Sequence, residues 1–139
     1  MTLTDRHIDV FFYGLFMDDK LLRSKGIVPM NPRPASLEGF GLRIGKRATL
    51  VPAKHERSYG MVMGLTHNEL QTLYSGPVLE HYHPEAVLCT TLSGEPVCAL
   101  CYNLPKAPAP QEVNEEYADQ LRAVLVKLGF PAESVERVR

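Results

Sequence analysis

The first apolar segment of the chain constrains the fold more than any other stretch. Residues 10–17 form a short apolar and aromatic run, typical of a buried strand, and Gly14 interrupts it. A helix-capable segment, residues 18–25, follows. Backbone N–H groups at such a turn lack ladder partners and can point together at an anion, and glycine lets a ligand come close to the backbone. The run therefore predicts a first strand followed by either an ordinary turn or a cradle for a carboxylate or phosphate.

Hydrophobic periodicity predicts a mixture of strands and helices along the rest of the chain. We expect strands near 8–13, 42–51, 59–65, 85–92 and 96–103, and helices near 17–24, 67–75 and 112–129, the last with an apolar face that begins at Val113. Prolines make residues 30–34 a connection, because proline lacks the N–H that a ladder needs. Three further prolines predict a stiff linker at residues 105–110. Strands, hairpins and helices in this order predict an α+β fold.

Three segments of the sequence resemble the γ-glutamylcyclotransferase family. Tyr13-Gly14-Leu15 resembles the Tyr-Gly-Ser loop that opens these proteins. Residues 60–73 resemble the family's glycine-bearing strand and the short helix with spaced leucines. Tyr117 and residues 128–131 resemble its closing helix. The resemblance covers most of the chain and implies one domain over residues 1–139, with a small mixed or antiparallel barrel-like β-sheet and flanking helices.

The resemblance also implies an activity. Family members cyclise a γ-glutamyl amine or peptide, because the substrate's α-amine attacks its own γ-carbonyl and releases 5-oxoproline and the amine. Such an enzyme needs donors for the carboxylate and the oxyanion, and a base for the ammonium proton, but no cofactor and no metal. On this resemblance, the substrate-binding loop comprises Tyr13, Gly14, Leu15, Phe16 and Met17.

The sequence departs from the family pattern at two positions. The family's glutamate base, counted along the matched strand and helix, falls on Pro77, which cannot accept a proton. The nearest carboxylate is Glu80, which is either a displaced general base or an exposed loop side chain. Leu15 stands where the family usually has serine, so backbone donors remain but a hydroxyl is lost. The chain is therefore either a cyclotransferase with a relocated base or an inactive relative that binds a small carboxylate or a protein partner.

Two tyrosines and two arginines are further candidates for the ligand site. The resemblance places Tyr82 and Tyr117 near the pocket, where a tyrosine offers an apolar face and a hydroxyl. Both are equally well explained as half-buried core aromatics. Arg43 and Arg47 have even spacing on a predicted strand, so they face either an acidic substrate or solvent.

The cysteines predict packing and not redox chemistry. Cys98 and Cys101 have the CxxC spacing but lie on a predicted strand, where residues three apart face opposite sides. If Ser93-Gly94 is a two-residue turn, Cys89 lies directly across from Cys98.

One alternative for the histidines is a zinc site. His81, His83 and Glu85 alternate on one face of an extended segment, and imidazoles with a carboxylate are zinc ligands. A tetrahedral ion would need a fourth ligand from elsewhere, so we expect no metal here.

Charge and hydropathy exclude some partners. A net charge of −1 gives no basic field for nucleic acid or anionic membranes. The polar N-terminal residues do not look like a signal peptide, and no apolar stretch approaches the ~18 residues that a bilayer requires. We therefore expect a cytoplasmic protein with a small-molecule ligand, and the sequence leaves its oligomeric state open.

Overall fold

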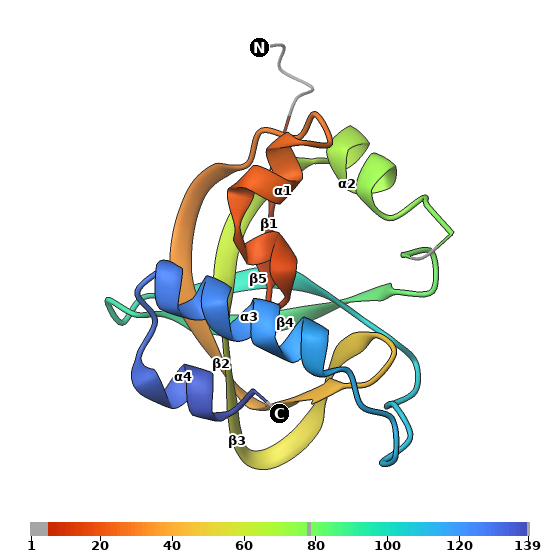
Figure 1. The fold of residues 1–139 in the computed structure, drawn as a ribbon. Helices are drawn as coiled ribbons and strands as arrows, with labels where there is room; N and C mark the ends of the chain where they lie inside the picture. The colour runs from red at the N-terminus through yellow and green to blue at the C-terminus, as the bar shows by residue number, and fades with distance from the viewer. Residues whose placement is uncertain (1–5, 78, 139) are drawn as a thin grey trace.

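A closed barrel of five strands forms the centre of the computed structural model, which describes residues 6–77 and 79–138 (Figure 1). The strands are β1 (His7–Phe12), β2 (Met30–Ile44), β3 (Ala48–Thr66), β4 (His83–Thr91) and β5 (Pro96–Asn103). Their order around the barrel is β1-β3-β2-β4-β5. Neighbours are antiparallel except at the closure, where β1 runs parallel to β5 with Val10 opposite Leu100. The predicted α+β fold with a mixed, barrel-like sheet is confirmed.

Strand β1 divides the core into two layers. Phe11 belongs to the apolar cluster inside the barrel, together with Leu37 and Val62. Val10 and Phe12 belong to the cluster between the barrel and its helices. Successive side chains of a strand point to opposite faces, so one uninterrupted apolar run supplies both layers.

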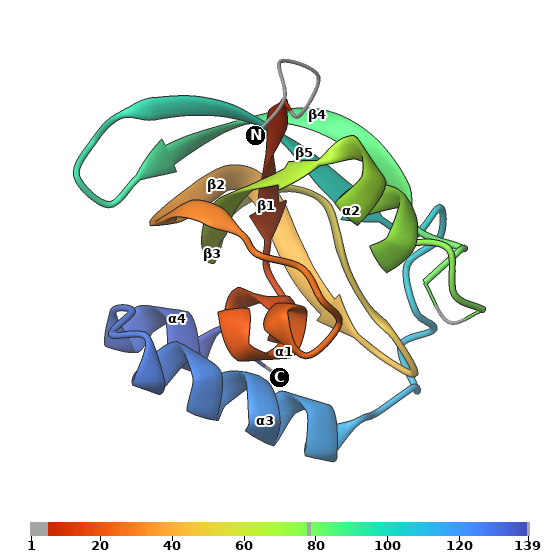
Figure 2. The same cartoon turned by 90° about the horizontal axis from the view of Figure 1, so that it is seen from above.

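The helices are short and flank the barrel. They are the 3₁₀ helix η1 (Leu15–Met17) and the α-helices α1 (Asp19–Arg23), α2 (His67–Leu73), α3 (Glu115–Lys127) and α4 (Ala132–Glu136). Figure 2 shows α1, α3 and α4 together on one side of the barrel, with α2 apart from them. Lys127 of α3 reaches Asp18, the N-cap of α1, at 3.0 Å. Among the described residues, no helix has the length and apolar character needed to cross a membrane.

The predictions for β2 and β3 were wrong in two places. The expected strand 42–51 is broken by a turn in which the Gly45 N–H donates to the Arg47 carbonyl, 3.1 Å away. The expected connection 30–34 is instead the beginning of β2. Asn31 has a φ of 50° beside a register shift that accommodates the first proline. Pro34 still uses its carbonyl, which accepts a hydrogen bond from the Leu92 N–H.

Helix boundaries also differ from the prediction. The expected helix 17–24 splits into η1 and α1, because the Asp18 side chain caps a new helix by accepting from the Lys20 N–H. The last long helix begins at Glu115 and not at 112, because Asn114 is its N-cap. Val113 therefore lies outside the helix and is 81% exposed, and helix α4 was not predicted. The expected connection at 105–110 holds neither helix nor strand, and its stiffness stays a prediction.

The β4–β5 hairpin corrects the pairing predicted for the cysteines. Its loop includes Leu92 as well as Ser93 and Gly94, since the Thr91 N–H donates to the Glu95 carbonyl. The extra residue shifts the register by one. Cys89 is therefore paired with Val97, and Cys98 with Leu88. The prediction that the two thiols of the CxxC segment diverge is confirmed, because Cys98 is exposed and Cys101 is buried.

The structure explains why the middle segment that resembles the family pattern, residues 60–73, has these residue types. Thr66 and Glu69 form a reciprocal capping box that starts α2 directly at the end of β3. At Gly60, a side chain would collide with the Phe12 carbonyl oxygen and with the Phe11 ring. Only glycine therefore lets β3 pass this closely over β1.

Candidate functional site

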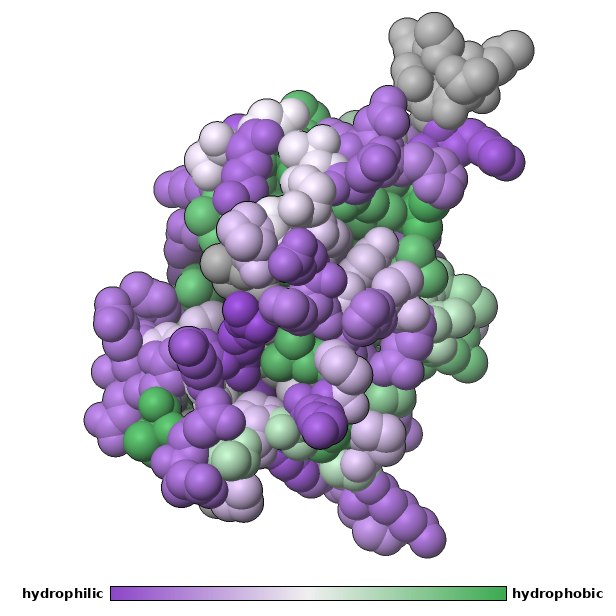
Figure 3. Space-filling view, turned by 90° about the vertical axis from the view of Figure 1, so that its right-hand side faces the viewer, coloured by the Kyte–Doolittle hydropathy of each residue, from purple (hydrophilic) through white to green (hydrophobic). Residues whose placement is uncertain are grey.

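A cavity of about 310 Å³ lies at the end of the barrel where β1 runs into η1. Its wall comes from the segments 11–16 and 46–48, with Leu21 of α1, Tyr74, Leu79 and Tyr82 after α2, Tyr102 of β5 and Tyr117 of α3. The β2–β3 turn and the loop after α2 lie on the right of Figure 1, on the side of the molecule shown in Figure 3. That face is mainly hydrophilic, with small hydrophobic areas between the polar residues.

Most of the predicted substrate-binding loop lines this cavity. Tyr13, Gly14, Leu15 and Phe16 belong to the wall, whereas Met17 does not: it is 2% exposed and packs in the core between the barrel and the helices. The 3₁₀ turn itself uses one of the loop's donors, because the N–H of Met17 donates to the Gly14 carbonyl at 3.0 Å. The N–H groups of Gly14 and Phe16 have no backbone acceptor within the described part of the chain. An anion cradle at this loop would use these two groups.

Gly14 and Tyr117 approach each other closely. A Cβ at Gly14 would lie 2.5 Å from the Tyr117 hydroxyl oxygen. Burial raises the pKa of Tyr117 to about 12, and the hydrogen bond with the Leu15 backbone works in the opposite direction. The absence of a side chain at position 14 thus lets a tyrosine from α3 close over the loop.

Five of the six tyrosines of the chain surround the cavity. The Tyr13 hydroxyl donates to the Tyr102 carbonyl at 2.8 Å, and the Tyr82 hydroxyl donates to the Ala48 carbonyl. The rings of Tyr74 and Tyr102 stack, with 3.8 Å between centroids and 8° between planes. Burial raises the pKa of each of these tyrosines, so their hydroxyls are protonated at neutral pH. The protons of Tyr13 and Tyr82 are already used in these bonds, so Tyr74 and Tyr102 can donate hydrogen bonds to a ligand, and all four tyrosines are poor bases.

The charged residues in the cavity wall are cations. Lys46 and Arg47 contribute to it, and no acidic side chain does so among the residues that the structure describes. Arg47 has no carboxylate within ion-pair distance in the described part of the chain. Its charge opposes the effect of burial on the pKa of Tyr82, and both side chains line the same cavity. Arg43 does not join Arg47, because it pairs with Glu56 at 2.9 Å on the outside of the barrel.

Glu80 lies outside the wall of the cavity. Its side chain is 57% exposed, and the ring of His81 is 4.0 Å from its carboxylate. Its neighbour Leu79 does line the cavity, as does Tyr82. The loop after α2 thus brings Leu79 and Tyr82 to the site and directs the predicted base to solvent.

The zinc alternative gains no support from the structure. Glu85, one of its three proposed ligands, accepts a hydrogen bond from the Asn103 amide. The described residues contain no group of three or more histidine, cysteine or acidic side chains with the geometry to hold a metal ion.

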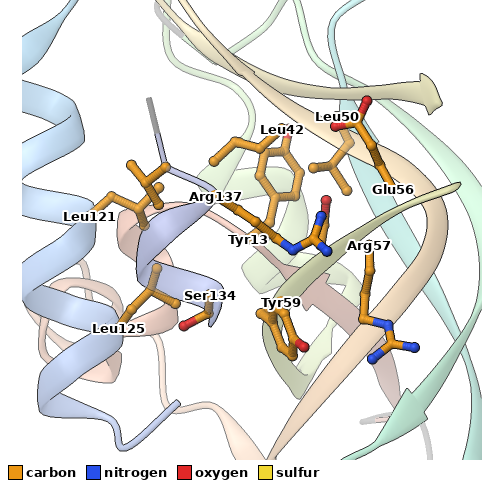
Figure 4. Close-up of a pocket in the computed structure, with 12 residues that line it drawn as sticks. Tyr13, Leu42, Leu50, Glu56, Arg57, Tyr59, Leu121, Leu125, Ser134 and Arg137 are labelled. Carbon is orange, nitrogen blue, oxygen red and sulfur yellow. The ribbon is translucent and has the colours of Figure 1, made fainter. Parts of the chain in front are cut away.

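Tyr13 separates this site from a much smaller cavity on the side of α3 and α4. That cavity holds about 30 Å³, roughly the volume of one water molecule. Figure 4 shows Tyr13 beside Leu42 and Leu50, with Arg137 extending from α4 towards β3. The small cavity itself is therefore too small for a ligand larger than water, whereas the cavity on the loop side of Tyr13 has room for one.

Comparisons with known proteins support the fold. No family model matches the chain, and no curated protein matches it in sequence. A solved γ-glutamyl cyclotransferase superposes with a TM-score of 0.76 over 95% of this chain and 86% of its own, at 18% identity. An uncharacterised human protein gives a TM-score of 0.75 over 96% of this chain and 87% of its own, at 19% identity. An AIG2-like mouse protein gives 0.58 over 80% and 90%, at 16% identity.

The chain therefore has the γ-glutamylcyclotransferase-like fold, as its sequence motifs predicted. Identities this low support a common fold and do not carry an activity with them. Sequence reasoning did not find Lys46, Tyr74 and Tyr102 as wall residues. The position of Tyr74 could have been found from the sequence, because it directly follows the short helix of the segment that resembles the family pattern.

Proposed function

We propose that the protein binds small carboxylate compounds of the γ-glutamyl type in the tyrosine-lined cavity and does not cyclise them. The observation that carries this proposal is Arg47, a half-buried cation without a carboxylate partner among the described residues, in a wall without an acidic side chain. A guanidinium in partly apolar surroundings gains from an anion that restores the hydrogen bonds it loses with water. A ligand carboxylate meets this need with two parallel hydrogen bonds.

The tyrosines favour the same ligand. Neutral phenol hydroxyls can donate to a carboxylate and to an amide carbonyl, and their rings cover an aliphatic chain. Neither the Tyr74 nor the Tyr102 hydroxyl has a protein acceptor within the described part of the chain, so both are available to a ligand. Together with Arg47 they offer a charged anchor and neutral donors in one cavity.

Cyclisation would need a base that takes the proton of the substrate ammonium. Pro77 stands at the family position of that base, and the exposed Glu80 carboxylate lies outside the wall. The raised pKa of each tyrosine opposes the phenolate form that would act as a base. These observations favour binding over turnover.

A cyclotransferase remains the second candidate, and one observation supports it. Leu79 lines the cavity, so the Glu80 backbone is one residue from the wall. A change in the side-chain and loop conformation on ligand binding would bring the carboxylate to the substrate. In that case Glu80 is the general base, and the loop at Gly14 with Tyr82 and Tyr117 holds the substrate.

Calorimetric titration with γ-glutamyl methylamide tests the binding proposal. We expect Arg47→Gln to weaken binding by roughly 10- to 100-fold, since hydrogen bonds to a charged group contribute about 1.5–3 kcal/mol. Arg57→Gln is the matched control, because Arg57 pairs with Glu38 and does not line this cavity. Equal affinity of the Arg47 variant and the wild type would contradict the proposal.

An assay for 5-oxoproline separates the two candidates. The binding proposal predicts no product from γ-glutamyl amines or dipeptides, although they bind. Product from the wild type, reduced by about two to four orders of magnitude in Glu80→Gln, would instead establish a cyclotransferase with a relocated base.

A further inference from the structure

The part of the cavity wall that comes from η1 and α1 is apolar. Leu15 and Phe16 are half-buried there, and Leu21 remains 38% exposed although it belongs to the wall. Leu79 adds a fourth apolar side chain from the loop after α2. Arg47 comes from the β2–β3 turn, so the charge and this apolar wall belong to different segments of the chain (Figures 1 and 2).

The cavity is also larger than an acidic head group requires. Its volume of about 310 Å³ corresponds to roughly ten water molecules at about 30 Å³ each. Cavities that enclose drug-sized ligands begin at about 300 Å³. A bound carboxylate and its amine, held at Arg47, would leave the apolar wall covered only by water.

We propose that the ligand joins a carboxylate head to an apolar or aromatic group, as in a γ-glutamyl amide of an arylalkyl amine. The head lies at Arg47, and the apolar group lies against Leu15, Leu21 and Leu79. The stacked pair of Tyr74 and Tyr102 adds aromatic surface to the wall of the same cavity. This inference rests on the proposed carboxylate site and names the class of compound that the site selects.

The apolar surface that the ligand buries determines how much more tightly an aromatic amide should bind than a methyl amide. Removing a phenyl group from water at about 25 cal/mol per Å² of apolar surface raises affinity by roughly 10- to 100-fold over a methyl group, when most of the ring is covered. A polar wall of the same size would give no such preference.

Two amides with the same head group test the inference. Calorimetric titration of the wild type should show that γ-glutamyl benzylamide binds roughly 10- to 100-fold more tightly than γ-glutamyl methylamide. Leu21→Ser and Leu79→Ser should each reduce the ratio of the two affinities several-fold. Val126→Ser is the matched control, because Val126 is 66% exposed and does not line the cavity, and it should leave the ratio unchanged.

The outcomes separate this inference from the proposed function. Equal binding of the two amides, or binding of the methylamide alone, would refute the inference that the ligand carries an apolar group. The proposed carboxylate site would remain intact. A benzyl preference that neither serine variant changes would overturn the assigned apolar wall. If neither amide binds to the wild type, the carboxylate site itself is wrong, and this inference is wrong with it.

Discussion

Placing a methyl group at position 14 should destabilise the protein through a single contact. In Gly14→Ala, the new Cβ would lie 2.5 Å from the Tyr117 hydroxyl oxygen, which must move until the contact reaches at least an ordinary 3.4 Å. Overpacking of this kind costs about 1–3 kcal/mol. We expect a decrease of about 2 kcal/mol in the free energy of unfolding, measured by urea denaturation.

Tyr117→Phe provides the control, because it removes the atom that clashes. The nearest atom would then be the ring Cζ, 3.8 Å from the new Cβ, which is an ordinary van der Waals distance. The φ of Gly14 is −109°, so alanine has no left-handed strain at this position. In the background of the Tyr117→Phe variant, Gly14→Ala should therefore cost little, and the coupling in the double-mutant cycle should exceed about 1 kcal/mol. Equal destabilisation in both backgrounds would refute the assigned contact.

Three further predictions concern the cap of α2, the carboxylate of α1 and the thiols. Thr66→Ala should lower the free energy of unfolding by about 1 kcal/mol through loss of the capping box, whereas Thr72→Ala on the exposed side of the same helix should not lower it. The hydrogen bond from Lys127, together with the Lys20 N–H, lowers the pKa of Asp18. The ionised Asp18 carboxylate therefore stabilises the folded state above its ordinary pKa of about 3.9, and this effect is lost as the pH falls through its lower folded-state pKa. Urea denaturation should show a smaller loss of stability between pH 5 and pH 2 in Asp18→Asn than in the wild type. A thiol reagent should modify Cys98 in the native protein but Cys89 and Cys101 only after unfolding, because burial raises the pKa of each of these two thiols to about 12; rapid native modification of all three would contradict this.

The features that local patterns determine were predicted well. The run at residues 10–12 has apolar residues at every position because both faces of β1 are covered, and this made it recognisable as a buried strand. Helix α2 was predicted from its spaced leucines, and the structure shows that a capping box of Thr66 and Glu69 begins it. The fold followed from these segments together with their resemblance to a family pattern.

The errors occurred where contacts distant in the sequence determine local structure. The turn at Gly45 packs against Pro108, a residue of the linker, and no pattern around position 45 contains that information. Pro34 is tolerated in β2 because its carbonyl, and not its missing N–H, meets the β4–β5 hairpin. Residue type suggested Glu80 as a base, but only the path of the loop decides whether its carboxylate faces the cavity or solvent. The even spacing of Arg43 and Arg47 predicted that both side chains share one face of a strand, whereas the turn between them separates the two side chains.

The parallel pairing of β1 with β5 has a consequence for how the chain reaches its native state. The β2–β3 and β4–β5 pairs are neighbours in the sequence, so each can form as a local hairpin with a small loop-closure entropy. Insertion of β1 between β3 and β5 instead joins distant parts of the chain at Val10 and Leu100, and such non-local pairing is slow. Until β1 inserts, β3 and β5 each present an unpaired edge that a second chain can extend. The pairing of β2 with β4, which places Ala35 opposite Thr91, is non-local as well, so the rates of both long-range pairings determine how long a newly made molecule can associate with its neighbours.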